Sequence, residues 1–139
     1  MSDFLTKPMR SKLMSTIKGK NNKDTELVLM QIFRRNCIKG WRRHQNVFGR
    51  PDFLFRKSRL AVFVDGCFWH GCPKHFKMPA GNRPFWKRKI ENNRARDGRV
   101  NRILRKSGWC VVRIWEHELK RPKRFLGRLK FKLSAADYM

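Results

Sequence analysis

Two continuous apolar runs constrain the fold of this chain more than any other feature of its sequence. The run Leu60–Val64 has the sequence LAVFV, and the run Trp109–Trp115 has the sequence WCVVRIW. Short runs of this kind are typical of strands buried on both faces of a sheet, so both predict central strands. The basic segment from residue 84 to about residue 106 predicts a long helix that stops at Ser107-Gly108. A helix between two strands favours a crossover that joins them in parallel.

The remaining segments predict an α/β domain with a mixed central sheet flanked by helices. Further helices are expected over Met9–Ile17, Glu26–Asn36 and Arg121–Leu133, and shorter strands over Trp41–Gln45 and Asp52–Phe55. Between them lie a basic break over Lys18–Lys23, a turn over Val47–Pro51 and an irregular loop over Gly66–Gly81. A length of 139 residues suits one domain.

The charge of the chain indicates a polyanionic partner. It has 35 Lys and Arg residues against 10 Asp and Glu residues, a formal net charge of +25. This favours nucleic acid, because phosphates relieve the repulsion between so many cations. No membrane partner is expected, since no apolar run could span a bilayer and no helix separates a basic face from an apolar one. The first ten residues lack the apolar segment of a secretion signal, so we expect the four cysteines to lie in a reducing cytosol.

Five residues offer the nitrogen and sulfur ligands that zinc prefers. Cys67, His70, Cys72 and His75 lie within nine residues, and His117 follows the second apolar run. Zinc takes four such ligands in a tetrahedron, and parallel pairing would bring the ends of the two runs together. The alternative is a pair of buried cysteines with histidines in solvent. We expect His70 to stay outside a zinc site, because a free imidazole beside a rigid metal loop is suited to proton transfer near neutral pH.

Acidic residues are scarce, and three of them lie where a carboxylate could serve a site. Asp52 opens a strand and Asp65 ends the next one, and carboxylates at paired strand ends can hold Mg²⁺. The alternative for both is an ordinary turn aspartate. Glu26 lies in the first turn of a helix, where it either opposes the helix dipole or orients His70 or a water bound to the metal.

Two aromatic pairs and a long run of basic residues follow the first apolar run. Phe68-Trp69 lies in the cysteine-containing loop and Phe85-Trp86 begins the long helix, so each pair either fills the core or forms a wedge that inserts between base steps. The basic residues of that helix are expected to follow DNA phosphates. Cys37 and Cys110 have apolar neighbours and are expected in the core.

Several strings in this sequence resemble the very short patch repair endonucleases. The most specific is Val64–Pro73 (VDGCFWHGCP), and the others are Gly49–Phe53 (GRPDF), Ile114–His117 (IWEH), Met9–Lys12 with Met14-Ser15, and Phe85-Trp86 with Lys89-Ile90 and Asn93. Together they span most of the chain. The resemblance implies a fold like that of type II restriction endonucleases, with a structural zinc site. It also implies a Mg²⁺-dependent nick in one strand, 5′ to the thymine of a T:G mismatch that arises when 5-methylcytosine deaminates.

The resemblance also implies roles for individual residues. By matching positions, Asp52 would be the principal Mg²⁺ ligand together with the backbone carbonyl of Val64, and His70 would be the general acid/base, supported by Glu26. Position 65 is His in some relatives and Asp here, so Asp65 is a candidate second Mg²⁺ ligand. The zinc ligands would be Cys67, Cys72, His75 and His117; the wedge would be Phe68, Trp69 and Trp86; and Lys12 and Met14 would contact DNA from an N-terminal arm.

This hypothesis divides the chain into an N-terminal DNA-contacting arm, residues 1–20, and a single endonuclease domain, residues 21–139. Its partner would be double-stranded DNA with a T:G mismatch. A nick in one strand suits a monomer, and the expected location is the bacterial cytoplasm, beside the nucleoid. The alternatives are a restriction-type endonuclease that cuts both strands, a non-catalytic DNA-binding module stabilised by zinc, and a basic RNA-binding protein.

Overall fold

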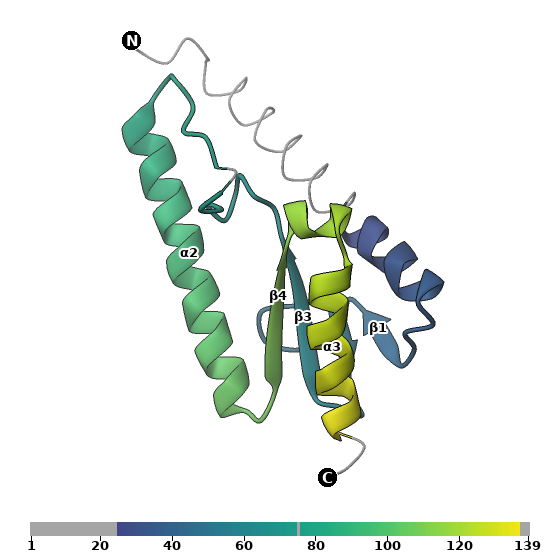
Figure 1. Cartoon of the computed structure of the whole chain (residues 1–139). Helices are drawn as coiled ribbons and strands as arrows, with labels where there is room; N and C mark the ends of the chain where they lie inside the picture. Colours follow the sequence, from purple (N-terminus) through teal and green to yellow (C-terminus); the bar gives the residue numbers. More distant parts are fainter. Residues whose placement is uncertain (1–24, 75, 137–139) are drawn as a thin grey trace.

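A computed structural model describes residues 25–74 and 76–136, which form a sheet between two layers of helices (Figure 1). In chain order these are a helix over residues 25–35, β1 (Trp41–Arg43), β2 (Phe53–Phe55), β3 (Leu60–Asp65), α2 (Arg83–Lys106), β4 (Cys110–Trp115), the 3-10 helix η1 (Glu116–Lys120) and α3 (Lys123–Ala136). The predicted α/β class is therefore confirmed. The helix expected over Met9–Ile17 and the break over Lys18–Lys23 lie outside the described residues.

The sheet has the order β1-β2-β3-β4 in the described part of the chain. The first two pairings are antiparallel, and β3 pairs with β4 in parallel with Leu60 opposite Cys110 and Asp65 opposite Trp115. The sheet is mixed, as predicted, and α2 is the crossover between the two parallel strands. Every residue of β3 is buried, which explains why its first five residues are apolar without a break.

The prediction that Trp109–Trp115 forms a central strand is wrong, because β4 is the last strand in the described sheet. Its burial alternates instead, with Val112 and Ile114 buried and Cys110 exposed. The apolar run reflects the helices that cover both faces of β4, not strands on both of its sides. Cys37 is exposed as well, with a φ of 57° just after the helix of residues 25–35, so the expected core position of both cysteines is also wrong.

The sheet separates two apolar cores, and the alternation of side chains along β3 assigns residues to each. Val62 and Val64 face the larger core, which is closed by the helix of residues 25–35 and by α3; Ala61 and Phe63 face the smaller core beneath α2. By the same alternation Asp65 belongs to the α2 face. No helix among residues 25–74 and 76–136 is long and apolar enough to cross a membrane.

The turn between β1 and β2 depends on Gly49. Its φ is +78°, and a Cβ atom built there would lie 2.4 Å from Cγ1 of Val100 on α2. Val100 is buried and branched at Cβ, so it cannot easily move aside. This close approach fixes the turn against α2 three residues before Asp52, which directly precedes β2.

We expect Gly49→Ala to lower the free energy of unfolding by about 1–3 kcal/mol, through the unfavourable φ and the overlap with Val100. Gly127 is the matched control, because it lies inside α3 with nothing within 4 Å of a built Cβ. Gly127→Ala should raise the free energy of unfolding by about 0.5–1 kcal/mol. Urea unfolding measures both, and equal effects of the two substitutions would contradict this account of the turn.

Candidate active site

The carboxyl ends of β3 and β4 meet at one edge of the sheet, and the candidate site lies there. Asp65 and Trp115 pair at this edge, and the chain continues from them into the irregular loop after β3 and into η1. The loop is tied to α2, since Asn93 Nδ2 donates a 2.9 Å hydrogen bond to the carbonyl of Trp69. A Cβ on Gly71 would come within 2.7 Å of Ile90, so the loop backbone also packs closely against the helix.

His70 is held by two carboxylates. Its Nδ1 is hydrogen-bonded to Oδ2 of Asp97, on α2, and lies 3.8 Å from Oδ1 of Asp65. Burial alone lowers the pKa of His70, but the hydrogen bond to Asp97 and the charge of Asp65 outweigh it, so the pKa lies above its ordinary value. With Nδ1 engaged in this way, Nε2 is the nitrogen left for proton transfer.

Asp52 lies beside the backbone of the neighbouring strand. The N–H of Val64 donates a 2.7 Å hydrogen bond to its Oδ2. Burial raises the pKa of Asp52 to about 6, against the effect of that hydrogen bond, and the charges of Glu26 and Asp65 raise it further. Burial likewise raises the pKa of Asp65, although His70 and Arg113 oppose the shift. Carboxylates that disfavour one another's charge in this way are suited to binding a divalent cation.

The resemblance implies that Glu26 supports His70, but in this structure Glu26 contacts other side chains. Glu26 is buried, and its Oε1 lies 3.0 Å from Nε of Arg43 and 3.2 Å from Nε2 of His44. Asp97 occupies Nδ1 of His70 instead, because the turn of α2 that carries it packs over the loop. Glu26 acts on the site from the other side, through its charge near Asp52.

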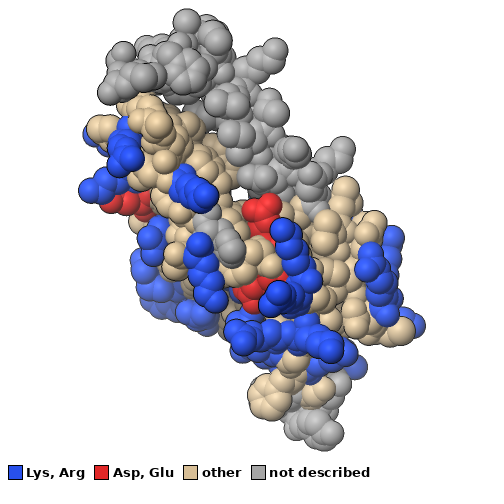
Figure 2. All heavy atoms as spheres, turned by 45° about the horizontal axis from the view of Figure 1, so that its top comes forward, with Lys and Arg blue, Asp and Glu red and all other residues tan. Residues whose placement is uncertain are grey.

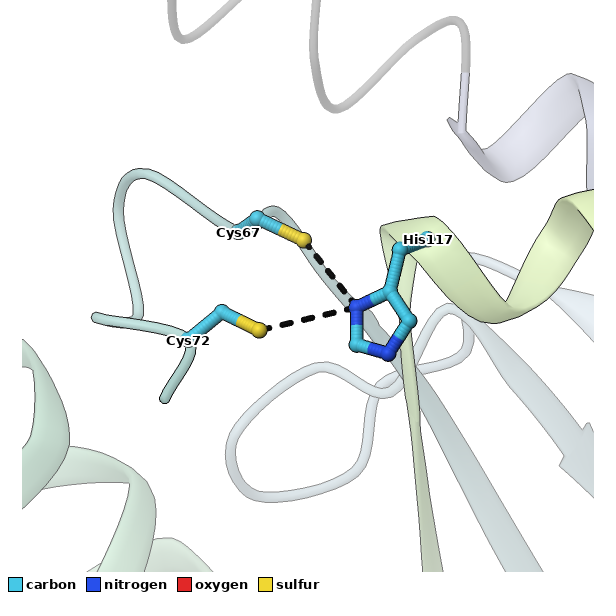
Figure 3. A group of neighbouring side chains, drawn as sticks. All are labelled: Cys67, Cys72 and His117. Carbon is cyan, nitrogen blue, oxygen red and sulfur yellow. Dashed lines mark hydrogen bonds between the residues drawn. The ribbon is translucent and has the colours of Figure 1, made fainter. Parts of the chain in front are cut away.

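Cys67, Cys72 and His117 form a second group at the same edge (Figure 3). Both thiols point to the same ring nitrogen, with 3.5 Å from each Sγ to Nδ1 of His117. Two ligands of a tetrahedral zinc ion, one sulfur and one nitrogen, lie about 3.6 Å apart for ordinary bond lengths. The three donors therefore fit a zinc ion, and His75, the fourth ligand of the prediction, lies outside the described residues.

Parallel pairing explains how this group forms, since Cys67 and Cys72 follow β3 and His117 follows β4. Burial raises the pKa of the Cys67 thiol to about 11, partly offset by His117. An ion that binds here must displace this proton, so its affinity will rise with pH. Among the described residues, His70 groups with Asp65 and Asp97 instead.

Asp97 is a site residue that sequence reasoning missed. It belongs to α2, whose sequence predicts only a basic surface, and it lies 27 positions away from His70. A signal was present, because Asp97 is one of few acids in a helix rich in Lys and Arg. Its place in the helix does not reveal which loop the helix packs against, so only the tertiary structure assigns its partner.

The predicted wedge residues are in contact with one another. The rings of Phe68 and Trp69 lie 5.2 Å apart, and those of Phe68 and Trp86 5.4 Å apart, both edge to face. Trp69 and Trp86 are 8% and 7% exposed and Phe68 is half-buried. In this structure they form one cluster between the loop and α2. Lys12 and Met14, the predicted contacts of the N-terminal arm, lie outside the described residues.

The surface around the site is strongly basic. Figure 2, which brings the end of the sheet with η1 forward, shows a few acidic side chains among many Lys and Arg residues. A hollow of about 970 Å³ beside the cysteine group is lined by Cys67, Cys72, Pro73, Lys74, Trp115, Glu116, His117, Glu118, Lys120, Arg121, Arg124 and Arg128. This distribution suits a polyanion that approaches the site.

Comparison with known proteins decides the family. The family model of DNA mismatch endonuclease Vsr matches residues 2–76 of the 139. This chain belongs to the Vsr family. The matched region includes Asp52, His70 and both cysteines of the metal-ligand group, and the mixed sheet with its helices is compatible with a Vsr nuclease fold. As a Vsr endonuclease, the protein hydrolyses DNA, and the family implies a divalent metal.

Three relatives illustrate the Vsr membership. The type II nicking enzyme V.NmeDIP of Neisseria meningitidis serogroup C is 40% identical over 119 residues, which cover 84% of this chain and 80% of that protein. The DNA mismatch endonuclease Vsr of Escherichia coli (strain K12) is 34% identical over 121 residues, covering 86% and 77%. The type II nicking enzyme V.NaeI of Lentzea aerocolonigenes is 48% identical over 69 residues, which are 50% of this chain but only 42% of that protein.

The raised pKa of Asp52 predicts that its negative charge lowers the free energy of unfolding when no divalent metal is bound. The pKa of about 6 in the folded protein lies above the ordinary value of 3.8. The contribution of the protonated carboxyl group to stability is therefore complete below pH 3.8 and is lost as the pH rises through 6. In Mg²⁺-free buffer at pH 8, Asp52→Asn should therefore raise the free energy of unfolding by about 2 kcal/mol, allowing for partial exposure. The gain should vanish at pH 4.

Urea unfolding at the two pH values measures this effect. Glu91→Gln is the control, because Glu91 is an exposed carboxylate on α2 and its substitution should leave the free energy of unfolding nearly unchanged at both. A loss of stability in Asp52→Asn at pH 8 would show that the carboxylate is not disfavoured by its surroundings.

Proposed function

We propose that this Vsr-family endonuclease nicks one strand of duplex DNA 5′ to the thymine of a T:G mismatch, by Mg²⁺-dependent hydrolysis, and so starts very short patch repair. The products would be a 5′-phosphate and a 3′-hydroxyl. The observation that carries the proposal is the separation of two polar groups at the sheet edge, one with His70 and carboxylates and one with the cysteines. Asp97 holds His70 apart from the cysteine group. Asp65 interacts with both His70 and Asp52: the charge of Asp65 raises the pKa of Asp52, and Oδ1 of Asp65 lies 3.8 Å from Nδ1 of His70.

Asp52 and the backbone carbonyl of Val64 are the proposed Mg²⁺ ligands. Bound there, Mg²⁺ would neutralise charge on the scissile phosphate and acidify water. His70 would move the proton at Nε2, because Asp97 holds Nδ1. Glu26 would support the site through its charge near Asp52. Asp65 is the weaker candidate for a second ligand, because its Oδ1 is already 2.9 Å from Nη1 of Arg113.

Zinc is the ion proposed for Cys67, Cys72 and His117, with His75 as the fourth ligand. Two thiols and an imidazole are a donor set that zinc prefers over magnesium. The site joins the loop after β3 to η1 after β4, so a bound ion would stiffen the loop that carries His70. Its proposed role is therefore structural.

Phe68, Trp69 and Trp86 are the proposed wedge at the mismatch. Unstacking base steps costs a few kcal/mol of free energy, and this cost is smallest at a mismatched pair. New contacts with the protein offset it. Trp69 adds a specific argument. Its buried Nε1–H has no hydrogen-bond acceptor among the described residues, and such a group costs about 1–3 kcal/mol. A rearrangement of the cluster on DNA would give this donor an acceptor.

The first test is a nicking assay with labelled T:G, T:A and C:G duplexes in Mg²⁺. We expect one strand of the T:G duplex to be cut. The shortened strand should appear on denaturing gels, while the duplex should still run as intact on native gels. Asp52→Asn and His70→Ala should each reduce the rate by at least about 100-fold, through loss of the metal ligand and of acid–base catalysis.

Three outcomes would contradict the proposed function. Equal cutting of all three duplexes would reject mismatch specificity, and double-strand breaks would indicate the restriction-type alternative. DNA binding without any cutting would indicate a non-catalytic binding module, and in that case Asp52→Asn would change only the affinity for DNA. Competition with RNA tests the RNA-binding alternative, because RNA should displace an enzyme specific for double-stranded DNA only weakly from its duplex.

The second test concerns zinc. Metal analysis of the purified protein should find about one zinc per chain, and Cys67→Ser or Cys72→Ser should lose it and lower the melting temperature, because the ion contributes to folding. Cys37→Ser and Cys110→Ser are matched controls, since both thiols are exposed and outside the group. Zinc retention in Cys72→Ser, or full stability and activity after complete removal of zinc, would refute the structural role.

A further inference from the structure

Arg113 is a charged residue at a position where the strand pattern calls for an apolar one. It lies on β4 on the same face as Val111, beneath α2 and next to the smaller apolar core. Its side chain is only 18% exposed, and its guanidinium carbon lies 4.2 Å from the centre of the Phe63 ring. A guanidinium so far out of water is costly unless its donors are paired.

The donors of Arg113 are directed to three residues. Nε donates to Oδ1 of Asn101 at 2.7 Å, and Nη1 donates to Oδ1 of Asp65 at 2.9 Å. Nη1 also lies 3.5 Å from Oδ1 of Asp97, and Nη2 donates to the backbone carbonyl of Asp97 at 3.5 Å. Asn101 and Asp97 are on α2 and Asp65 ends β3, so one side chain from β4 connects three elements.

Both carboxylates that Arg113 contacts also face His70. Oδ2 of Asp97 bonds Nδ1 of His70, while Oδ1 of the same carboxylate is turned to Arg113. Asp65 makes the same kind of double contact through Oδ1, with Arg113 and with His70. Without the guanidinium, two buried or half-buried carboxylates would repel each other across the imidazole.

We propose that Arg113 is a positioning residue for the nicking reaction. It holds the carboxylates of Asp65 and Asp97 together, so that Asp97 keeps the His70 ring in one orientation with Nε2 free. The planar fork of arginine suits this task, because it can serve several acceptors in fixed directions. Asp65 is then an anchor for Arg113. The inference rests on the proposed function for its DNA substrate and for the proton transfer at Nε2 of His70.

The experiment compares Arg113→Met with the wild type on the duplex that the wild type nicks. The single-turnover rate at saturating DNA should fall about 10–100-fold, the size usual for partners that orient a reacting group. Affinity for the same duplex, measured without Mg²⁺, should change little, because Arg113 does not contact DNA in this account. An unchanged single-turnover rate, or a loss confined to affinity, would overturn the proposal.

Arg59→Met is the matched control. Arg59 also lies against a ring, with its guanidinium 5.1 Å from the centre of Trp109, and also donates to backbone carbonyls, those of Ser107 and Gly108. It precedes β3, at the opposite end of the strand from the site. Its substitution should lower stability without changing the single-turnover rate. Should Arg113→Met fail to fold, Arg113→Lys keeps the charge without the fork and should show the same split between rate and affinity.

A spectroscopic readout separates this proposal from the proposed function. Nitrogen-15 spectra of the histidine rings, with His70→Ala as the assignment, should show Nδ1 of His70 as a protonated, hydrogen-bonded nitrogen in the wild type. In Arg113→Met or Arg113→Lys that signal should shift towards a freely exchanging ring. An unchanged signal would overturn the proposal. If the wild type nicks no duplex, the proposed function fails and the ring signal still decides the role of Arg113.

Discussion

The parallel pairing of β3 with β4 is the interaction on which the rest of the site depends. It places Asp65 opposite Trp115, so that residues fifty positions apart in the chain leave the sheet side by side. The loop after β3 and the 3-10 helix after β4 begin at this edge. Without that register, Cys67 and Cys72 could not face His117, and Arg113 could not reach Asp65. Backbone hydrogen bonds between two strands thus assemble both groups of polar residues.

The position of each residue on a sheet face or beyond the strand ends then keeps the carboxylate network apart from the cysteine group. Residues that alternate along β3 and β4 face either α2 or the core beneath α3, and the network of Asp65, Asp97 and Arg113 lies on the α2 face. The cysteines and His117 lie past the strand ends. His70 can lie between Cys67 and Cys72 in sequence and still belong to the other group. In the proposed function, that separation leaves the His70 imidazole available for proton transfer.

Much of this could be predicted from local sequence. The strands and the crossover helix follow from apolar runs and from the stop at Ser107-Gly108, because backbone hydrogen bonding and side-chain burial act over a few residues. The proximity of Cys67, Cys72 and His117 followed from one further assumption, the parallel pairing. The position of β4 at the edge did not, since helices that cover both faces of a strand produce the same apolar run as strands on both sides.

The sequence by itself therefore determined the elements, the basic charge and the residue types that can hold metals or move a proton, because these depend on side-chain chemistry and short-range periodicity. The tertiary structure alone decided the partners: Asp97 instead of Glu26 beside His70, Arg113 between two carboxylates, and Cys37 and Cys110 outside the core. Those pairings depend on how α2 packs over the loop and on which face of a strand is covered. Such contacts join distant segments, and no local pattern records them.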